Sequence, residues 1–298
     1  NLINDENPDY IVVFGADNIY RMNVRQMLDA HIDSGLAATV AAIRVPRSEA
    51  SAFGIIDAGS DNVIDRFLEK PSDPPGLPDS PEESFASMGN YVFSRKQFVD
   101  LLNLDGQNHD SKHDMGGNII PAFVAQRECG VYDFTQNEVP GATEKDRNYW
   151  RDVGTIDAYF DAHMDLISVV PEFNLYNDRW PILTQQPQLP GAKFTLHGTA
   201  ESSIVTNGCI ISGGDVEHSV LSPGVRVEDH ASVDRCVVMH NARIGRNAVL
   251  RNVILDKNVQ VADGVHIGID READEARGFH VSSNGVTVVP KNAKVDSI

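Results

Sequence analysis

The sequence predicts an α/β domain followed by a parallel β-helix, with a linker between them. Three observations predict this architecture. Apolar strands alternate with amphipathic helices over the first 170 residues, a proline-rich stretch without a sustained period follows, and a 17-residue repeat begins near residue 200. We therefore expect one domain at 1–170, a linker at 171–199 and a second domain at 200–298.

The first domain is expected to contain a mixed, mainly parallel sheet with helices on its faces. Strands are predicted at 10–16 and 37–45, with a helix that ends on Gly35 between them. Residues 52–71 are typical of two strands around a turn, and 87–104 of a strand followed by a helix. Because ligands of such sheets bind at the carboxyl ends of the strands, polar residues there are the first candidates for chemistry.

The second domain is identified by columns of similar residues that recur every 17 positions. Three aliphatic columns predict the walls of a prism with an apolar interior, and a fourth column of Asn and Gly predicts one tight turn in each coil. The columns are Ile210/Val227/Ile244/Val261, Val216/Val233/Leu250/Ile267, Ile204/Leu221/Val238/Leu255 and Asn207/Gly224/Asn241/Asn258. Unrelated strands of a β-sandwich would not share one period, so a parallel β-helix is the better interpretation.

The composition argues against several classes of function. The chain has 43 acidic and 25 basic residues, a formal net charge of −18, so nucleic acid and anionic membranes would be repelled. The most continuous apolar stretch, residues 35–43, is about half as long as a membrane span. Three widely spaced cysteines, and an opening stretch without the features of a signal peptide, predict a cytoplasmic location.

The first candidate residue is Asp17, which follows a buried strand in VVFGADN, residues 12–18. Its carboxylate could cap the helix that follows, or it could bind Mg²⁺, which takes one or two carboxylates and completes its shell with water and substrate phosphates. A second carboxylate is available at Asp152 in YWRDVGT, residues 149–155. The alternative for Asp152 is a structural pair with the neighbouring arginine at a turn.

The second candidate segment is FLEKP, residues 67–71, in which Glu69 and Lys70 are adjacent at the end of a strand. A carboxylate that accepts hydrogen bonds from hydroxyl groups, beside a cation for a phosphate, is what a sugar phosphate requires. A surface ion pair is the alternative. The proline at 71 is expected to stop the strand and to leave the backbone of Lys70 extended.

With these segments in order and a β-helix after them, the chain resembles the sugar-nucleotide pyrophosphorylases. The resemblance is strongest to those that make ADP-glucose for bacterial glycogen synthesis, and within them to the actinobacterial branch. It rests on ASAFGII, FLEKPSDPPGLPDSPEESFASMGNYVF, HDMGGNIIP, YWRDVGTIDAYFDAHMDLISVVPEFNLYNDRWPI and ILDKNV, which follow the family's order over essentially the whole chain. It implies a Rossmann-like nucleotidyltransferase domain, incomplete at its N-terminus, and a left-handed parallel β-helix.

Carried over by motif, the resemblance implies roles for individual residues. Asp17 and Asp152 would hold Mg²⁺ together with the phosphates of ATP, and Lys70 would bind the phosphate of glucose 1-phosphate. The sugar-phosphate site would be lined by Gly54, Glu69, Lys70 and Ser87. The implied reaction is attack by a phosphate oxygen of glucose 1-phosphate on the α-phosphorus of ATP, with release of pyrophosphate. The family further implies a homotetramer.

The sequence departs from the family's pattern in two places. GADN and Asn23 stand where the family usually has AGDH followed by Asp. The loop GGxGxRLxPLT, which binds the phosphates of ATP in the family, does not occur. We therefore expect that this chain is a fragment without the adenine site and part of the regulatory site, and that it makes little or no ADP-glucose by itself.

Three alternative functions stay open from the sequence. One is a pyrophosphorylase for another nucleotide or sugar phosphate, because the part that reads the base is the part expected to be missing. Another is a non-catalytic regulatory or assembly subunit, against which the retention of Asp17, Lys70 and Asp152 argues. The last is a β-helix acyltransferase, which needs a catalytic histidine between coils. The candidates for that histidine, which share no column of the repeat, are His218, His230, His240 and His266.

Overall fold

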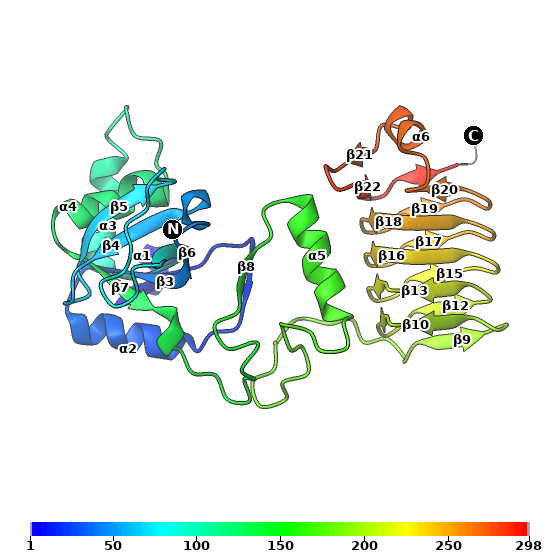
Figure 1. Ribbon diagram of the computed structural model, residues 1–298, viewed down its shortest axis with the longest axis horizontal. Coiled ribbons are helices and arrows are strands. Elements are labelled where there is room, and N and C mark those ends of the chain that lie inside the picture. The colour runs from blue at the N-terminus through cyan, green and yellow to red at the C-terminus, as the bar shows by residue number, and fades with distance from the viewer. Residues whose placement is uncertain (1, 297–298) are drawn as a thin grey trace. The chain divides into compact units, whose positions relative to one another are not determined.

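The computed structural model describes residues 2–296, and its internal contacts divide the chain into two compact units (Figure 1). The first unit ends at Trp150 and the second begins at Arg151. The domain and linker boundaries drawn from the sequence, at 170 and 199, stay predictions. Residues 1, 297 and 298 of the predicted domains lie outside the described residues.

The first unit is an α/β domain built on one sheet. Its helices are α1 (Leu2–Glu6), α2 (Val24–Ser34), α3 (Arg95–Asp105) and α4 (Ile120–Ala125), with short helical turns at η1 (Ala50–Ala52), η2 (Met115–Ile119) and η3 (Phe134–Gln136). Its strands are β1 (Tyr10–Val13), β2 (Asn18–Tyr20), β3 (Ala38–Pro46), β4 (Gly54–Ala58), β5 (Ile64–Glu69), β6 (Glu83–Ser94) and β7 (Cys129–Asp133). A further short strand, β8 (Trp150–Asp152), runs across the division between the units.

The sheet of the first unit is mixed, as the sequence predicts, but the pairs among its described strands are mostly antiparallel rather than mainly parallel. Its order is β5-β4-β6-β3-β7, and β1 pairs with the second half of β6. β3 and β7 run parallel, whereas β6 is antiparallel to β1, β3 and β4, and β4 is antiparallel to β5. The long strand β6 therefore lies at the centre, and the start of β4 and the end of β5 lie near its middle.

The alternation of side chains along β3 separates two apolar layers. Val40 and Ala42 pack in a cluster with Phe98 of α3 and Phe123 of α4. Ala41 and Ile43 belong to a second cluster, which contains Met27 of α2. Helix α2 ends on Gly35 as predicted, because this glycine takes the left-handed conformation (φ 66°) that terminates a helix.

The second unit is a parallel β-solenoid, as predicted, whose coils stack in chain order from β9 to β23 (Figure 1). Its helices are α5 (Ile156–Leu166) and α6 (Arg271–Ala276). Its strands are β9 (Lys193–Thr195), β10 (Thr199–Glu201), β11 (Ile204–Val205), β12 (Ile210–Ser212), β13 (Asp215–Glu217), β14 (Val220–Leu221), β15 (Arg226–Val227), β16 (Ser232–Val238), β17 (Arg243–Ile244), β18 (Val249–Leu255), β19 (Gln260–Val261), β20 (His266–Ile267), β21 (His280–Val281), β22 (Thr287–Val289) and β23 (Lys294–Val295). The handedness of the solenoid stays a prediction.

The stacking confirms the 17-residue period in the middle coils and corrects it in the first coil. Val227 lies beside Ile244, which lies beside Val261, but the partner of Val227 in the first coil is Ile211 rather than Ile210. Likewise Leu221 pairs with Val205 rather than with Ile204. The reason is that the segment through Gly213 and Gly214 is one residue shorter than its counterpart in the next coil, which places the preceding partners 16 residues apart.

The corner turns adopt left-handed backbone, and the predicted Asn/Gly column is one of them. Its members are Gly208 (φ 73°), Gly224 (φ 78°), Asn241 (φ 60°), Asn258 (φ 62°) and Asn292 (φ 63°). Gly208 replaces the predicted Asn207, because the first coil is one residue out of register. The Asn241 amide donates to Asn258 at 3.4 Å and the Asn258 amide donates to Asn292 at 2.9 Å, so the turns are joined along the solenoid.

Helix α5 packs on the solenoid within the second unit. Phe160 is 2% exposed and lies in an apolar cluster with Val237, Ile254 and Val286, which come from three different coils. The first turn of α5 is fixed as well, because the carboxylate of Asp157 accepts hydrogen bonds from the hydroxyl groups of Ser282 and Ser283. Among the described helices of both units, none has the length and apolarity that a membrane span requires.

Candidate active site

Three of the predicted sugar-phosphate residues meet on adjacent strands of the first unit. Gly54 of β4 is paired directly with Glu69 of β5. A Cβ atom at position 54 would lie 3.3 Å from Oε2 of Glu69 and 3.0 Å from Cζ of Phe67, so a larger residue would make these side chains shift by a few tenths of an ångström. On the other side of β4, Ile55 pairs with Ala86, which puts Ser87 of β6 next to Gly54.

Lys70 lies beside this group, with a backbone that differs from the prediction. Its φ is 46°, in the left-handed region, so the expectation of an extended residue before Pro71 is wrong. The turn is held because the Lys70 amide donates to the carbonyl of Phe53 at 3.1 Å, which directs the chain back towards Gly54. Nζ of Lys70 is 4.0 Å from Oε1 of Glu69, and both side chains are more than 60% exposed. A pair so long and so exposed contributes little to stability and leaves both groups available to a ligand.

The structure adds Tyr91 and Asp114 to this cluster, which the sequence reasoning did not assign. Burial raises the pKa of Tyr91, a hydrogen bond with Ser87 opposes the rise, and the charges of Asp114 and Glu69 add to it. Ser87, Asp114 and Glu69 therefore all act on the Tyr91 hydroxyl group. In the sequence, the polar residue Asp114 lies in HDMGG, residues 113–117. In the structure its carboxylate accepts a hydrogen bond from the amide of Gly117 at 2.5 Å.

Asp17 does not cap the helix that follows it, so that interpretation is wrong. The cap of α2 is Asn23, whose side chain accepts a hydrogen bond from the amide of Arg25 at 3.2 Å. The Asp17 carboxylate is exposed and accepts a hydrogen bond from the Asn18 side chain at 3.2 Å. A capping role therefore explains Asn23, and Asp17 requires another explanation.

The loop that carries Asp17 is fixed against β6, the strand that carries Ser87. The amide of Gly15 donates to the carbonyl of Gly89 at 3.1 Å, and the hydroxyl of Tyr20 donates to Asn90 at 3.2 Å. These contacts hold both sides of Asp17. The structure thus brings the Asp17 loop and the cluster around Gly54 to the same strand of the sheet.

Asp152 lies at the end of β8, at the start of the second unit. Its Oδ1 atom accepts a hydrogen bond from the amide of Gly154 at 2.9 Å, and its side chain is exposed. Within residues 2–296 it forms no ion pair with Arg151, so the structural pair expected as an alternative does not form. Since Asp17 and Asp152 belong to different units, their meeting at one cation stays a prediction.

The two carboxylates fit a hard cation by their chemistry. Each offers oxygen ligands on an exposed side chain, and the hydrogen bonds from Asn18 and Gly154 occupy Oδ1 of Asp17 and of Asp152, respectively. Mg²⁺ needs only one or two protein carboxylates, with its remaining positions left to water and phosphate oxygens. Asp17 and Asp152 are thus suited to Mg²⁺.

Two of the histidines that an acyltransferase would need lie at corners of the solenoid. His218 (φ 43°) and His230 (φ 58°) both occupy left-handed corners of the solenoid. Each also has a carboxylate neighbour, since Nδ1 of His218 lies 3.4 Å from Asp234 and Nδ1 of His230 lies 3.0 Å from Asp229. These two side chains therefore belong to different corners of the coils and are not gathered at one site.

Comparison with known proteins gives matches over both units. A family model described as "Nucleotidyl transferase" matches residues 1–169, and one described as "GlmU-like, C-terminal hexapeptide" matches residues 190–289. The chain is 62% identical over 295 residues to "Glucose-1-phosphate adenylyltransferase" of Cutibacterium acnes, covering 99% of this chain and 72% of that protein. Proteins of the same name from Frankia casuarinae and Corynebacterium jeikeium are 58% and 57% identical, with 99% of this chain and 73% of each relative covered.

Proposed function

The chain belongs to the glucose-1-phosphate adenylyltransferases, and on this premise we propose that Gly54, Glu69, Lys70 and Ser87 bind glucose 1-phosphate for transfer of an adenylyl group from ATP. The observation that supports this site most strongly is the pairing of Gly54 with Glu69, next to Ser87. Residues from three separate motifs of the sequence converge there, and the absent side chain at 54 leaves the carboxylate free to face a ligand.

Each residue of the cluster has a role that follows from its chemistry. The ammonium group of Lys70 neutralises the phosphate of glucose 1-phosphate, and the Glu69 carboxylate accepts hydrogen bonds from sugar hydroxyl groups. A phosphate oxygen of the bound sugar then attacks the α-phosphorus of ATP, the bond to the bridging oxygen breaks, and pyrophosphate leaves. The protein contributes by positioning and charge neutralisation, since no covalent intermediate is required.

We propose Asp17 and Asp152 as the residues that hold Mg²⁺. When bound, the ion would neutralise negative charge on the phosphates of ATP. The support from this chain is the exposed carboxylate of Asp17, which has no capping role, and the fixed loop on which it lies. The expectation that a phosphate-binding loop precedes this chain, and that the chain alone forms little product, stays a prediction.

Binding of glucose 1-phosphate, measured by isothermal titration calorimetry on this chain, tests the proposed site. Lys70→Gln should weaken binding about tenfold or more, because it removes the only charge in the cluster that attracts the phosphate. Gly54→Ala should weaken it by displacing Glu69, whereas Gly191→Ala, where a Cβ meets nothing within 4 Å, should have no effect. Equal binding by all three variants would contradict the site.

Formation of ADP-glucose tests the reaction, in this chain preceded by a segment that carries the GGxGxRLxPLT loop. Asp17→Asn and Asp152→Asn should each abolish turnover while leaving the binding of glucose 1-phosphate intact. Offering UTP or dTTP in place of ATP distinguishes an enzyme for another nucleotide. Turnover that survives both substitutions would contradict the roles proposed for Asp17 and Asp152, whereas no turnover in the unsubstituted protein would favour the non-catalytic subunit.

We further propose that the protein is a cytoplasmic homotetramer. The buried, unpaired cysteines Cys129, Cys209 and Cys236 support a reducing compartment. Exposed apolar side chains at the first coil, Phe194 (46%) and Leu196 (65%), support contact with a second copy. Light scattering after size-exclusion chromatography should report a smaller assembly for Leu196→Glu than for Leu104→Glu, its equally exposed counterpart in the first unit.

A further inference from the structure

One outer wall of the solenoid carries a row of basic residues that the proposed reaction does not use. The strands β15, β17, β19 and β23 are adjacent in one parallel sheet. Their first residues are in register, so that Arg226, Arg243, Gln260 and Lys294 form a single column. Because the next residue of each strand points into the core and is at most 5% exposed, the members of this column all point outward.

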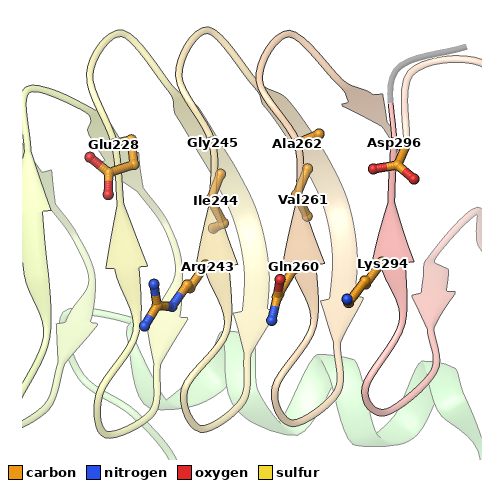
Figure 2. A pocket seen from close by; sticks show the side chains of 9 residues that line it. All are labelled: Glu228, Arg243, Ile244, Gly245, Gln260, Val261, Ala262, Lys294 and Asp296. Carbon is orange, nitrogen blue, oxygen red and sulfur yellow. The ribbon is translucent and has the colours of Figure 1, made fainter.

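A hollow of about 270 Å³ lies over this wall, because the next outward column contains two small residues. Gly245 and Ala262 occupy the middle of that column, where larger side chains would fill the space. Figure 2 shows Arg243, Gln260 and Lys294 in a row along one side of the hollow, with Glu228 and Asp296 at its two ends. The hollow therefore has a flat floor, a basic side and two acidic ends.

The charged groups around the hollow are not neutralised by one another. Within the described part of the chain, Arg243, Lys294, Glu228 and Asp296 form no salt bridge and no side-chain hydrogen bond. Their charges face water in a protein whose formal net charge is −18. Neighbouring strands are about 4.8 Å apart, so the side chains of Arg243 and Lys294, which are two strands apart, can reach the same anion.

The arrangement distinguishes between kinds of anion. A guanidinium group and an ammonium group together match the oxygens of a single phosphate, and Gln260 between them offers one more donor. The carboxylates at both ends would repel the further charges of a polyanion, but they accept hydrogen bonds from hydroxyl groups. A compact ligand with one phosphate and several hydroxyl groups satisfies both requirements.

We propose that this hollow is a second ligand site, which binds a small phosphorylated polyol with its phosphate between Arg243 and Lys294 and its hydroxyl groups directed to Glu228 at one end. The site lies entirely in the second unit and does not depend on the proposed reaction. Its ligand connects β17 to β23 across β19, so binding raises the stability of the last coils.

Calorimetric titration with glycerol 3-phosphate tests the site. The protein used is the full chain carrying Lys70→Gln, which removes the phosphate site proposed in the first unit. In this background Arg243→Gln and Lys294→Gln should each weaken binding about tenfold, because each removes one charge-assisted contact. Arg226→Gln is the matched control, since Arg226 lies in the same column and is also exposed but does not line the hollow.

Inorganic phosphate and glycerol test separately the binding of the phosphate group and the binding of the hydroxyl groups. We expect inorganic phosphate to bind more weakly than glycerol 3-phosphate, and Glu228→Gln to reduce that preference. Glycerol alone should not bind at the same concentrations. The site would be disproved by the absence of saturable binding, or by a loss in Arg226→Gln as large as in Arg243→Gln, which would indicate diffuse surface charge. Because Lys70 is already replaced, neither result depends on the proposed active site.

Discussion

Lys70 occupies a backbone conformation that its residue type does not favour. Its φ of 46° costs a side chain with a Cβ atom about 1 kcal/mol relative to glycine. Residues held in such conformations cluster at functional sites, where the fold fixes a side chain at the expense of stability. The fold thus holds Lys70 in a conformation that costs stability, which is compatible with a functional role.

Replacement by glycine separates these two contributions. Lys70→Gly should raise the free energy of unfolding by about 1 kcal/mol, because glycine adopts this backbone without strain, while it abolishes binding of glucose 1-phosphate. Urea denaturation and calorimetry measure the two quantities. Asn62, with φ 60°, is the control, because Asn62→Gly should change neither stability nor binding appreciably. A loss of stability in Lys70→Gly would mean that its side chain stabilises the fold.

Single residues also show what the sequence can predict about the site. The motif EKP identified Glu69 and Lys70, and the fold brings Gly54 beside Glu69. The sequence left two roles open for Asp17, because a cap depends on where the helix begins, and only the structure locates that start after Asn23. Tyr91 was missed for a related reason: Asp114 lies at the start of η2, and its charge acts on Tyr91 of β6 through the fold and not through sequence spacing.

At the scale of elements, the loss of unfolding free energy on replacing a corner glycine depends on what surrounds that corner of the solenoid. Gly264 and Gly224 both have positive φ, of 71° and 78°, but a Cβ at 264 would meet nothing within 4 Å, whereas a Cβ at 224 would lie 2.5 Å from Oδ1 of Asn241. Gly264→Ala should therefore cost about 1 kcal/mol of unfolding free energy, from backbone strain alone. Gly224→Ala should cost more, about 2 kcal/mol, because it also displaces Asn241 from its hydrogen bond.

Asparagine at the same position provides the comparison. Gly224→Asn should cost less than Gly224→Ala, since asparagine tolerates the left-handed turn and occupies this position in the following coils. Equal costs for the alanine variants at 224 and 264, measured by urea denaturation, would show that the stacked corners contribute nothing.

The attachment of α5 predicts a dependence of stability on pH. The hydroxyl groups of Ser282 and Ser283 hold the pKa of Asp157 below its ordinary value of 3.8. A carboxylate whose pKa is lowered by folding stabilises the protein above the unfolded pKa, and this contribution disappears as the pH falls through the folded pKa. Asp157→Asn should therefore be less stable than the unsubstituted chain at pH 7, and the difference should shrink as the pH falls below 3.8.

The control for Asp157 lies on the same helix. Asp161 is exposed, and among residues 2–296 its side chain forms no hydrogen bond, so Asp161→Asn should not alter stability at either pH. If the difference between Asp157→Asn and the unsubstituted chain stayed constant down to the lowest pH at which both fold, the carboxylate charge would have no part in holding α5.

The elements of the solenoid also show which features the 17-residue repeat predicts correctly and which it does not. The repeat predicted the solenoid and the stacking of Val216, Val233 and Leu250, because each wall buries one aliphatic side chain per coil. It misplaced Ile210 by one residue, since a corner that passes through two glycines can be one residue shorter without losing its apolar walls. The sequence of helix α5 is typical of an amphipathic helix of an α/β domain. Its apolar spacing does not indicate that it packs on the coils.

At the scale of the whole molecule, each unit has a core of its own. The apolar clusters of the first unit contain residues up to Trp150, and those of the second contain residues from Ile156 onward. Stability is therefore distributed over two bodies, each of which buries its own apolar side chains. The proposed sugar-phosphate site is confined to the first, and the basic hollow to the second.

This division predicts that residues 151–298 fold by themselves. Circular dichroism should report β-structure with a cooperative thermal transition, and glycerol 3-phosphate should bind as in the full chain, whereas glucose 1-phosphate at Lys70 should be lost. A shorter piece, residues 171–298, tests the role of α5, because it exposes Val237, Ile254 and Val286, which are at most 4% exposed beneath that helix. It should melt at a lower temperature and aggregate sooner, since uncovered apolar side chains favour association. If both pieces were equally stable, the packing of α5 would not belong to the solenoid's fold, and a boundary near 170 would describe the chain better than one at 150.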